Sequence, residues 1–155
     1  MKFLELSNTL NITERKINSI SIIKSKIESH LHAWLARTNL TDTVITFKNT
    51  IFNSGTSVYI PRYKLLEIIR EGKIVLEKQR SSLRISWVVK LDTLYFMALC
   101  FSAILFIITH SYCNIELIYA FSISLAFFLL MVFLGIQLIK YRLTDMIYSC
   151  VYPKT

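Results

Sequence analysis

Glycine is scarce in this sequence of 155 residues, with only Gly55, Gly72 and Gly135 present. Loops that hold phosphate groups through backbone N–H groups need closely spaced glycines, so the sequence contains no such loop. Paired carboxylates are missing from apolar surroundings, and no two histidines have the i, i+4 spacing of a helical metal site. These absences argue against catalysis, and we expect a protein that is not an enzyme and holds no cofactor or metal.

The cysteines do not indicate a disulfide framework either. The three cysteines, Cys100, Cys113 and Cys150, are an odd number and contain no C-x-x-C motif. This pattern argues against a set of intramolecular disulfides and against a structural zinc site.

Charge is missing from two long stretches. No Lys, Arg, Asp, Glu or His occurs in residues 93–109 or in residues 117–139. A spanning helix needs about 20 apolar residues, because the hydrocarbon core is about 30 Å thick and each residue rises about 1.5 Å. Residues 91–139 are therefore predicted to form a two-helix transmembrane hairpin with a short loop at 110–116. The alternative is a buried helical hairpin of a soluble protein, in which such runs are usually about 10–14 residues long.

The placement of Lys and Arg around these runs predicts their orientation. Basic residues precede the first run and follow the second, whereas the loop between the runs has none. Because cytoplasmic flanks carry the excess of Lys and Arg, both termini are expected in the cytosol, in a bacterial inner membrane. The residues expected at the membrane surface are Arg80, Arg84, Lys90, Lys140 and Arg142.

The net charge of +8 belongs entirely to the region before the first run. Residues 1–90 contain fifteen Lys or Arg and seven Asp or Glu, and residues 91–155 contain three of each kind. A basic region beside a membrane is attracted to anionic lipid, by about 1 kcal/mol per basic residue near the surface. Nucleic-acid binding is disfavoured, because the basic residues are spread singly and no recognition motif accompanies them.

Residues 1–90 read as a cytosolic α+β region. Isoleucines and leucines recur every three or four residues in the first part, which predicts an amphipathic helix at 13–37. β-Branched and aromatic residues on both sides of a turn signal predict a β-hairpin at 43–60, and a helical stripe predicts a juxtamembrane helix at 62–90. Residues 140–155 read as a short helical tail with a frayed end. The expected fold is a mainly α membrane protein with this α+β region ahead of the hairpin.

Small residues recur four positions apart in both apolar runs. Such pairs allow membrane helices to approach closely and serine hydroxyls to bond across the contact. In an antiparallel hairpin Ser102 lies level with Ser124. The pairs either serve only the packing of the hairpin within one chain, or one of the two pairs in the second run contacts a neighbouring subunit. The residues predicted to mediate helix packing or oligomerisation are Ala98, Ser102, Ala120, Ser122, Ser124 and Ala126.

In layout, the chain resembles two-span effectors of bacterial antiviral defence, and also exclusion or immunity proteins carried by plasmids and prophages. No ionisable residue lies within either run, which argues against a transporter and allows a pore only through oligomerisation. The leading hypothesis is a self-associating effector that perturbs the membrane when residues 1–90 receive a signal or partner. The alternatives are an exclusion or immunity protein and an accessory subunit of a larger membrane complex.

Overall fold

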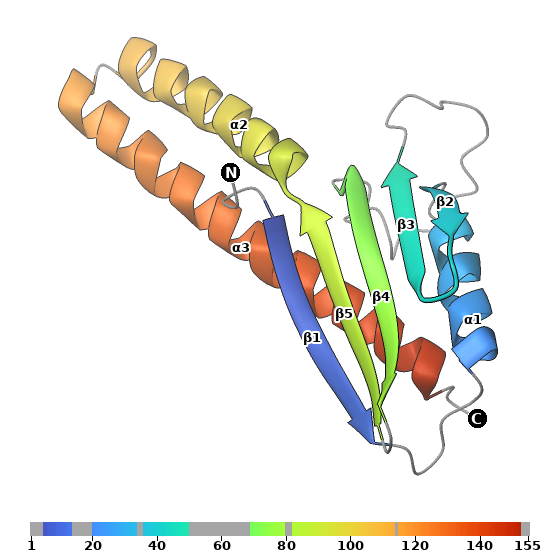
Figure 1. Cartoon of the computed structure of the whole chain (residues 1–155). Coiled ribbons are helices and arrows are strands. Elements are labelled where there is room, and N and C mark those ends of the chain that lie inside the picture. Colours follow the sequence, from blue (N-terminus) through green and yellow to red (C-terminus); the bar gives the residue numbers. More distant parts are fainter. Residues whose placement is uncertain are drawn as a thin grey trace.

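A computed structural model describes residues 5–13, 20–33, 36–49, 69–79, 82–113 and 115–152. An N-terminal α+β region is followed by two long apolar helices (Figure 1). The elements are β1 (Glu5–Thr13), α1 (Ile20–Ala33), β2 (Ala36–Leu40), β3 (Val44–Asn49), β4 (Glu71–Gln79), β5 (Ser82–Lys90), α2 (Asp92–Ser111) and α3 (Leu117–Val151). The strands form one antiparallel sheet in the order β1-β5-β4-β3-β2.

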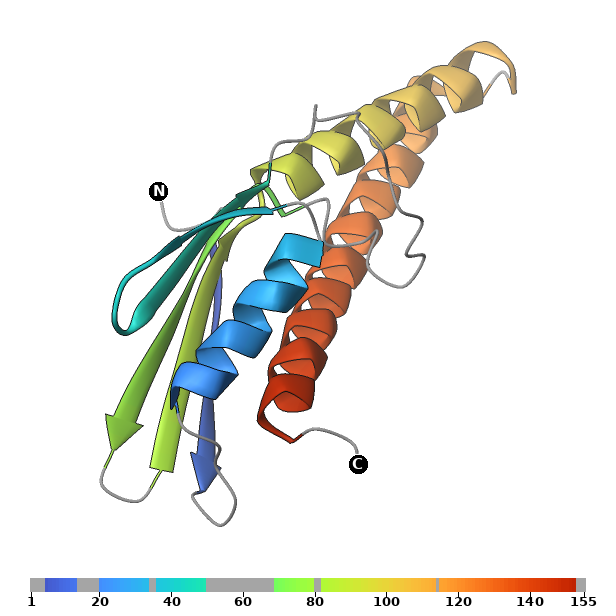
Figure 2. The same ribbon diagram turned by 90° about the vertical axis from the view of Figure 1, so that its right-hand side faces the viewer.

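One face of the sheet is apolar because residues on each strand alternate between the two faces. On β5, the buried residues Leu83, Ile85, Trp87 and Val89 alternate with residues that are exposed or half-buried. Helix α1 and the second half of α3 cover this face side by side, and the opposite face is left open (Figure 2). Antiparallel sheets commonly have one face on the core and one face in water, and this sheet follows that arrangement.

The amphipathic helix predicted at 13–37 is confirmed in its central part. Ile23, Ile27 and Leu31 lie four residues apart on α1, and all three are fully buried against the sheet and α3. The predicted ends are wrong, because Thr13 belongs to β1 and Arg37 belongs to β2. Residues 14–19 and 34–35 lie outside the described residues.

The predicted β-hairpin at 43–60 is confirmed only as far as its first strand. β3 pairs with β2 on one side and with β4 on the other. Residues 50–68, which include the predicted turn and second strand, lie outside the described residues.

The juxtamembrane helix predicted at 62–90 is wrong over the described part of that range. β4 and β5 occupy it as an antiparallel pair. Leu76 and Leu83 are seven residues apart, which fits two turns of a helix, but they lie on two different strands, β4 and β5. Along β5, buried residues alternate with more exposed ones, and this two-residue period of a strand is the pattern that predicts the structure correctly.

Gly72 lies at a close contact in the middle of the sheet. It sits on β4 between Phe47 of β3 and Val89 of β5, which are its register partners. A Cβ atom at this position would lie 2.3 Å from Cζ of Phe47, so the aromatic ring occupies the place of a side chain. A glycine inside a helix would cost about 1 kcal/mol relative to alanine. In the sheet, Gly72 is instead covered by the aromatic ring of Phe47 on the neighbouring strand.

Both α2 and α3 are long and apolar enough to cross a membrane. Only Leu91 separates β5 from α2, so the sheet leads directly into the first of these helices. Helix α3 has 35 residues, which at about 1.5 Å per residue corresponds to about 52 Å. Its first half packs against α2, and its second half packs against the sheet and α1 (Figures 1 and 2).

The helical extension predicted within 140–155 is confirmed as far as Val151, where α3 ends, but this part of the helix is a core element and not a tail. Residues of the second half of α3 recur at three- and four-residue spacing and are buried in the same cluster as the sheet residues. The buried residues are Ile139, Leu143, Met146, Ile147, Cys150 and Val151.

We expect Leu143→Ala to lower the free energy of unfolding by about 2–5 kcal/mol, because Leu143 is 0% exposed and its removal leaves a cavity between α3 and the sheet. Denaturant unfolding in detergent measures this difference. Tyr141→Ala, at an exposed position one half-turn away, is the control and should change stability by about 0.5 kcal/mol or less. Equal effects of the two substitutions would show that the second half of α3 is not a core element.

Candidate functional site

The small residues of the apolar helices divide into two groups. Ala98 and Ser102 of α2 and Ala120 and Ser124 of α3 are buried where the two helices meet. The Ser102 hydroxyl donates a hydrogen bond of 2.8 Å to the backbone oxygen of Ser124. Close approach of the backbones therefore joins α2 to α3 within one chain.

Ser122 and Ala126 lie on the side of α3 that faces away from α2, and both are exposed. The Ser122 hydroxyl donates to the backbone oxygen of Ile118 at 2.8 Å, within its own helix. A serine bonded in this way presents a small and largely apolar surface. This second pair takes no part in the buried contact between α2 and α3.

An apolar groove of about 410 Å³ runs between α2 and α3. Ser102 and Ser124 lie in it, and the Ser124 hydroxyl has no hydrogen-bond partner among the described residues. The other lining residues are Leu99, Ala103, Phe106, Phe121, Leu125 and Phe128.

Of the basic residues predicted at the membrane surface, those that the structure describes lie on β5 and α3. Lys90 lies two residues before the start of α2, whereas Arg84 lies six residues further back along β5, or about 20 Å at about 3.4 Å per residue. Lys140 is exposed and Arg142 is half-buried on α3. Arg80 lies outside the described residues.

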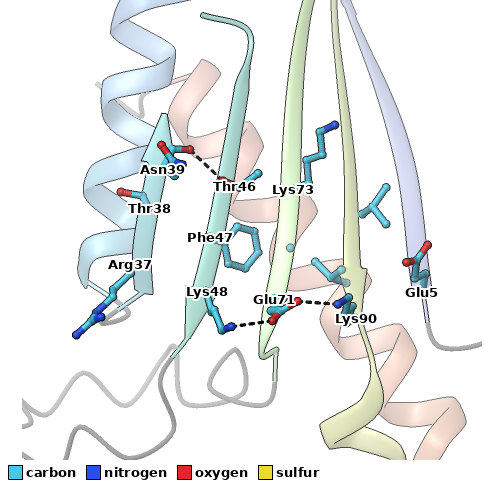
Figure 3. Close-up of a pocket in the computed structure, with 13 residues that line it drawn as sticks. Glu5, Arg37, Thr38, Asn39, Thr46, Phe47, Lys48, Glu71, Lys73 and Lys90 are labelled. Carbon is cyan, nitrogen blue, oxygen red and sulfur yellow. Dashed lines mark hydrogen bonds and ion pairs between the residues drawn. The ribbon is translucent and has the colours of Figure 1, made fainter. Parts of the chain in front are cut away.

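A row of charged residues crosses the open face of the sheet at the end nearest α2. The strand register places Arg37 beside Lys48 and Glu5 beside Lys90. Between them, Glu71 pairs with Lys48 at 3.2 Å and with Lys90 at 2.7 Å (Figure 3). Five strands thus contribute one charge each, and the signs alternate everywhere except at the pair Arg37–Lys48.

The ion pairs change the acidity of their members. The ammonium groups of Lys90 and Lys48, which hydrogen-bond to the Glu71 carboxylate, hold the pKa of Glu71 below its usual value of 4.5. In turn, the hydrogen bond to Glu71 raises the pKa of Lys90 above its usual value of 10.5. The Glu71–Lys90 pair is therefore held in its charged form at neutral pH.

A groove of about 640 Å³ lies on the open face beside this row. The charged row forms one side of the groove, and the next row along the strands forms the other, with Asn39, Thr46, Lys73 and Val88 (Figure 3). The residues between the two rows are Thr38, Phe47, Gly72 and Val89. The side chains of Phe47 and Val89 are buried on the helix-covered side of the sheet, so strand backbone forms the floor of the groove.

Sequence reasoning missed this groove because, of the five strands that line it, only β3 was predicted as a strand; β4 and β5 were predicted as helix, and β1 and β2 were not predicted as strands. The alternation from Leu83 to Val89 was the signal that could have identified β5, and pairing then brings Lys48, Glu71 and Lys90 together. Within the described residues, no group of three or more His, Cys, Asp or Glu could hold a metal ion.

Comparison with known proteins adds no assignment: no protein-family model, curated protein or solved structure matches the chain.

We expect Glu71→Gln to destabilise the sheet at neutral pH and to have a smaller effect in acid. Because the folded-state pKa of Glu71 lies below the unfolded-state value of 4.5, its stabilisation is present above that pH and is lost as the pH falls through the folded-state pKa. Thermal unfolding of both forms between pH 7 and pH 3 measures the difference. Glu77→Gln, on the same strand, is the control, and a gap between wild type and Glu71→Gln that does not change with pH would contradict the ion-pair row.

Proposed function

We propose that this chain is a small non-enzymatic integral membrane protein that self-associates and perturbs the membrane when its α+β region receives a signal. The observation that supports the proposal best is the course of α3. Its first half packs against α2 through small residues, and its second half belongs to the core beneath the sheet. One uninterrupted helix therefore connects the α+β region to the apolar hairpin, so a conformational change in the region can be transmitted to the hairpin.

The other connection is equally short. β5 ends at Lys90 and α2 begins at Asp92, so a shift of β5, an interior strand of the sheet, acts directly on α2. Packed elements joined in this way move as bodies and not as independent segments. The two helices of the hairpin are thus both anchored in the folded region that would receive the signal.

The proposed location is a bacterial inner membrane, with both termini in the cytosol. β1 and the last turns of α3 lie in one folded body, which supports placing the two ends of the chain on the same side of the membrane. The excess of Lys and Arg in the flanks of the apolar runs favours the cytosolic side.

Self-association is constrained by the membrane, because neighbouring copies must be related by an axis along the membrane normal. The strands run roughly along the hairpin (Figures 1 and 2). Antiparallel pairing of two β1 edges would need a two-fold axis perpendicular to the sheet, which would point the two hairpins in opposite directions. We therefore place the contact on the apolar helices, at the exposed pair Ser122 and Ala126.

The test combines controlled expression in bacteria with a membrane-potential dye. We expect the wild-type chain to depolarise the membrane, Ser122→Leu to remain folded but lose both crosslinked oligomers and depolarisation, and Ser122→Ala to behave as wild type because it keeps the small surface. Ser102→Leu should instead reduce the amount of folded protein, since it obstructs the contact between α2 and α3. A tolerated wild-type chain that co-purifies with a larger protein would contradict the effector function and favour an exclusion, immunity or accessory role.

A further inference from the structure

Two cations beside the open-face groove have no side-chain partner within the part of the chain that the structure describes. Lys48 and Lys90 are both paired with Glu71, and Lys90 also lies opposite Glu5. Arg37 and Lys73 are exposed, and their side chains form no ion pair or hydrogen bond among the described residues. The side chains that line the groove carry four positive and two negative charges, so the groove has an excess of positive charge that its own carboxylates do not balance.

The dimensions of the groove suit a small organic ligand. Its volume of about 640 Å³ falls within the range of about 300–1,000 Å³ typical of small-molecule sites. Figure 3 shows Arg37 and Lys73 on different sides of it, on strands β2 and β4. A ligand that met both cations would therefore extend across the groove and over β3. Asn39 and Thr46 line the same side as Lys73 and add polar groups.

We propose that this groove binds a phosphate-bearing anion, with Arg37 and Lys73 as the residues that meet its charge. Arg is suited to phosphate because its planar guanidinium binds two oxygens at once, and Lys supplies a compact charge to a third. The inference rests on the proposed function, in which it supplies the signal received by the α+β region. A ligand that tied β2 to β4 would act next to β5, which leads into α2.

Two sources can supply this chemistry. The charged row lies within two residues of the start of α2, at the depth where a lipid headgroup would lie if α2 spans the membrane. A soluble phosphate ester would instead enter from the open face. Both would use the same two cations, so the experiment separates the sources by supplying them one at a time.

The experiment measures thermal unfolding of the full-length chain in lipid nanodiscs. In the first arm the nanodisc contains only phosphatidylcholine and inorganic pyrophosphate is titrated. In the second arm no pyrophosphate is added and phosphatidylglycerol is the anionic lipid of the nanodisc. At about 100 times the Kd, a ligand bound only by the folded state should raise the Tm by about 5–10 °C.

Each arm compares wild type with Arg37→Gln, Lys73→Gln and Arg84→Gln. Arg84→Gln is the matched control, because it removes the same charge from the same sheet face outside the groove. We expect wild type and the control to respond in at least one arm, and Arg37→Gln and Lys73→Gln to lose most of that response. The responding arm identifies the source.

No response in either arm, or an equal response of all four proteins, would overturn the proposal. The result is independent of membrane activity, because nanodiscs hold no membrane potential. A chain that binds in the groove but does not depolarise cells would contradict the proposed effector function and leave the binding site in place. A chain that depolarises cells without binding either probe would contradict the binding site and leave the proposed effector function in place.

Discussion

The structure depends on burial of the second half of α3 beneath the sheet. Leu143 and Ile147 are fully buried there and belong to the same cluster as Trp87 and Ile85 of β5. The apolar sheet face needs such a cover, since α1 has only 14 residues and cannot shield five strands alone. The helix that completes the core is thus the same one that begins in the apolar hairpin, and neither part can be displaced without affecting the other.

Two direct links therefore join the α+β region to the hairpin, one through β5 and one through α3. β5 lies between β1 and β4, continues into α2, and carries Lys90 of the charged row. The open-face groove therefore lies beside the strand that is connected most closely to the first apolar helix. A ligand in the groove and a contact between hairpins would act on the two ends of one packed unit.

The sequence predicted the hairpin well because the absence of charge over a fixed length is a property of the chain alone. It also placed Ser102 level with Ser124, since an antiparallel pair of helices of known rise fixes that register. It failed for β4 and β5 because a spacing of seven between Leu76 and Leu83 fits a helix as well as two paired strands. It predicted the helix at residues 140–151 but missed its burial, because a short amphipathic segment does not reveal which surface it will cover. The charged row depends on pairing between strands that are far apart in sequence, which no local pattern specifies.

The most direct test of the account is amide hydrogen exchange along α3 in the detergent-solubilised chain. If the second half of this helix is a core element, the amides of residues 140–151 exchange as slowly as those of Ile74 and Trp87 in the sheet, because they open only when the whole α+β region unfolds. Exchange of residues 140–151 at the rate of an unstructured chain, with the sheet still protected, would contradict the shared helix and the coupling that is proposed to run through it.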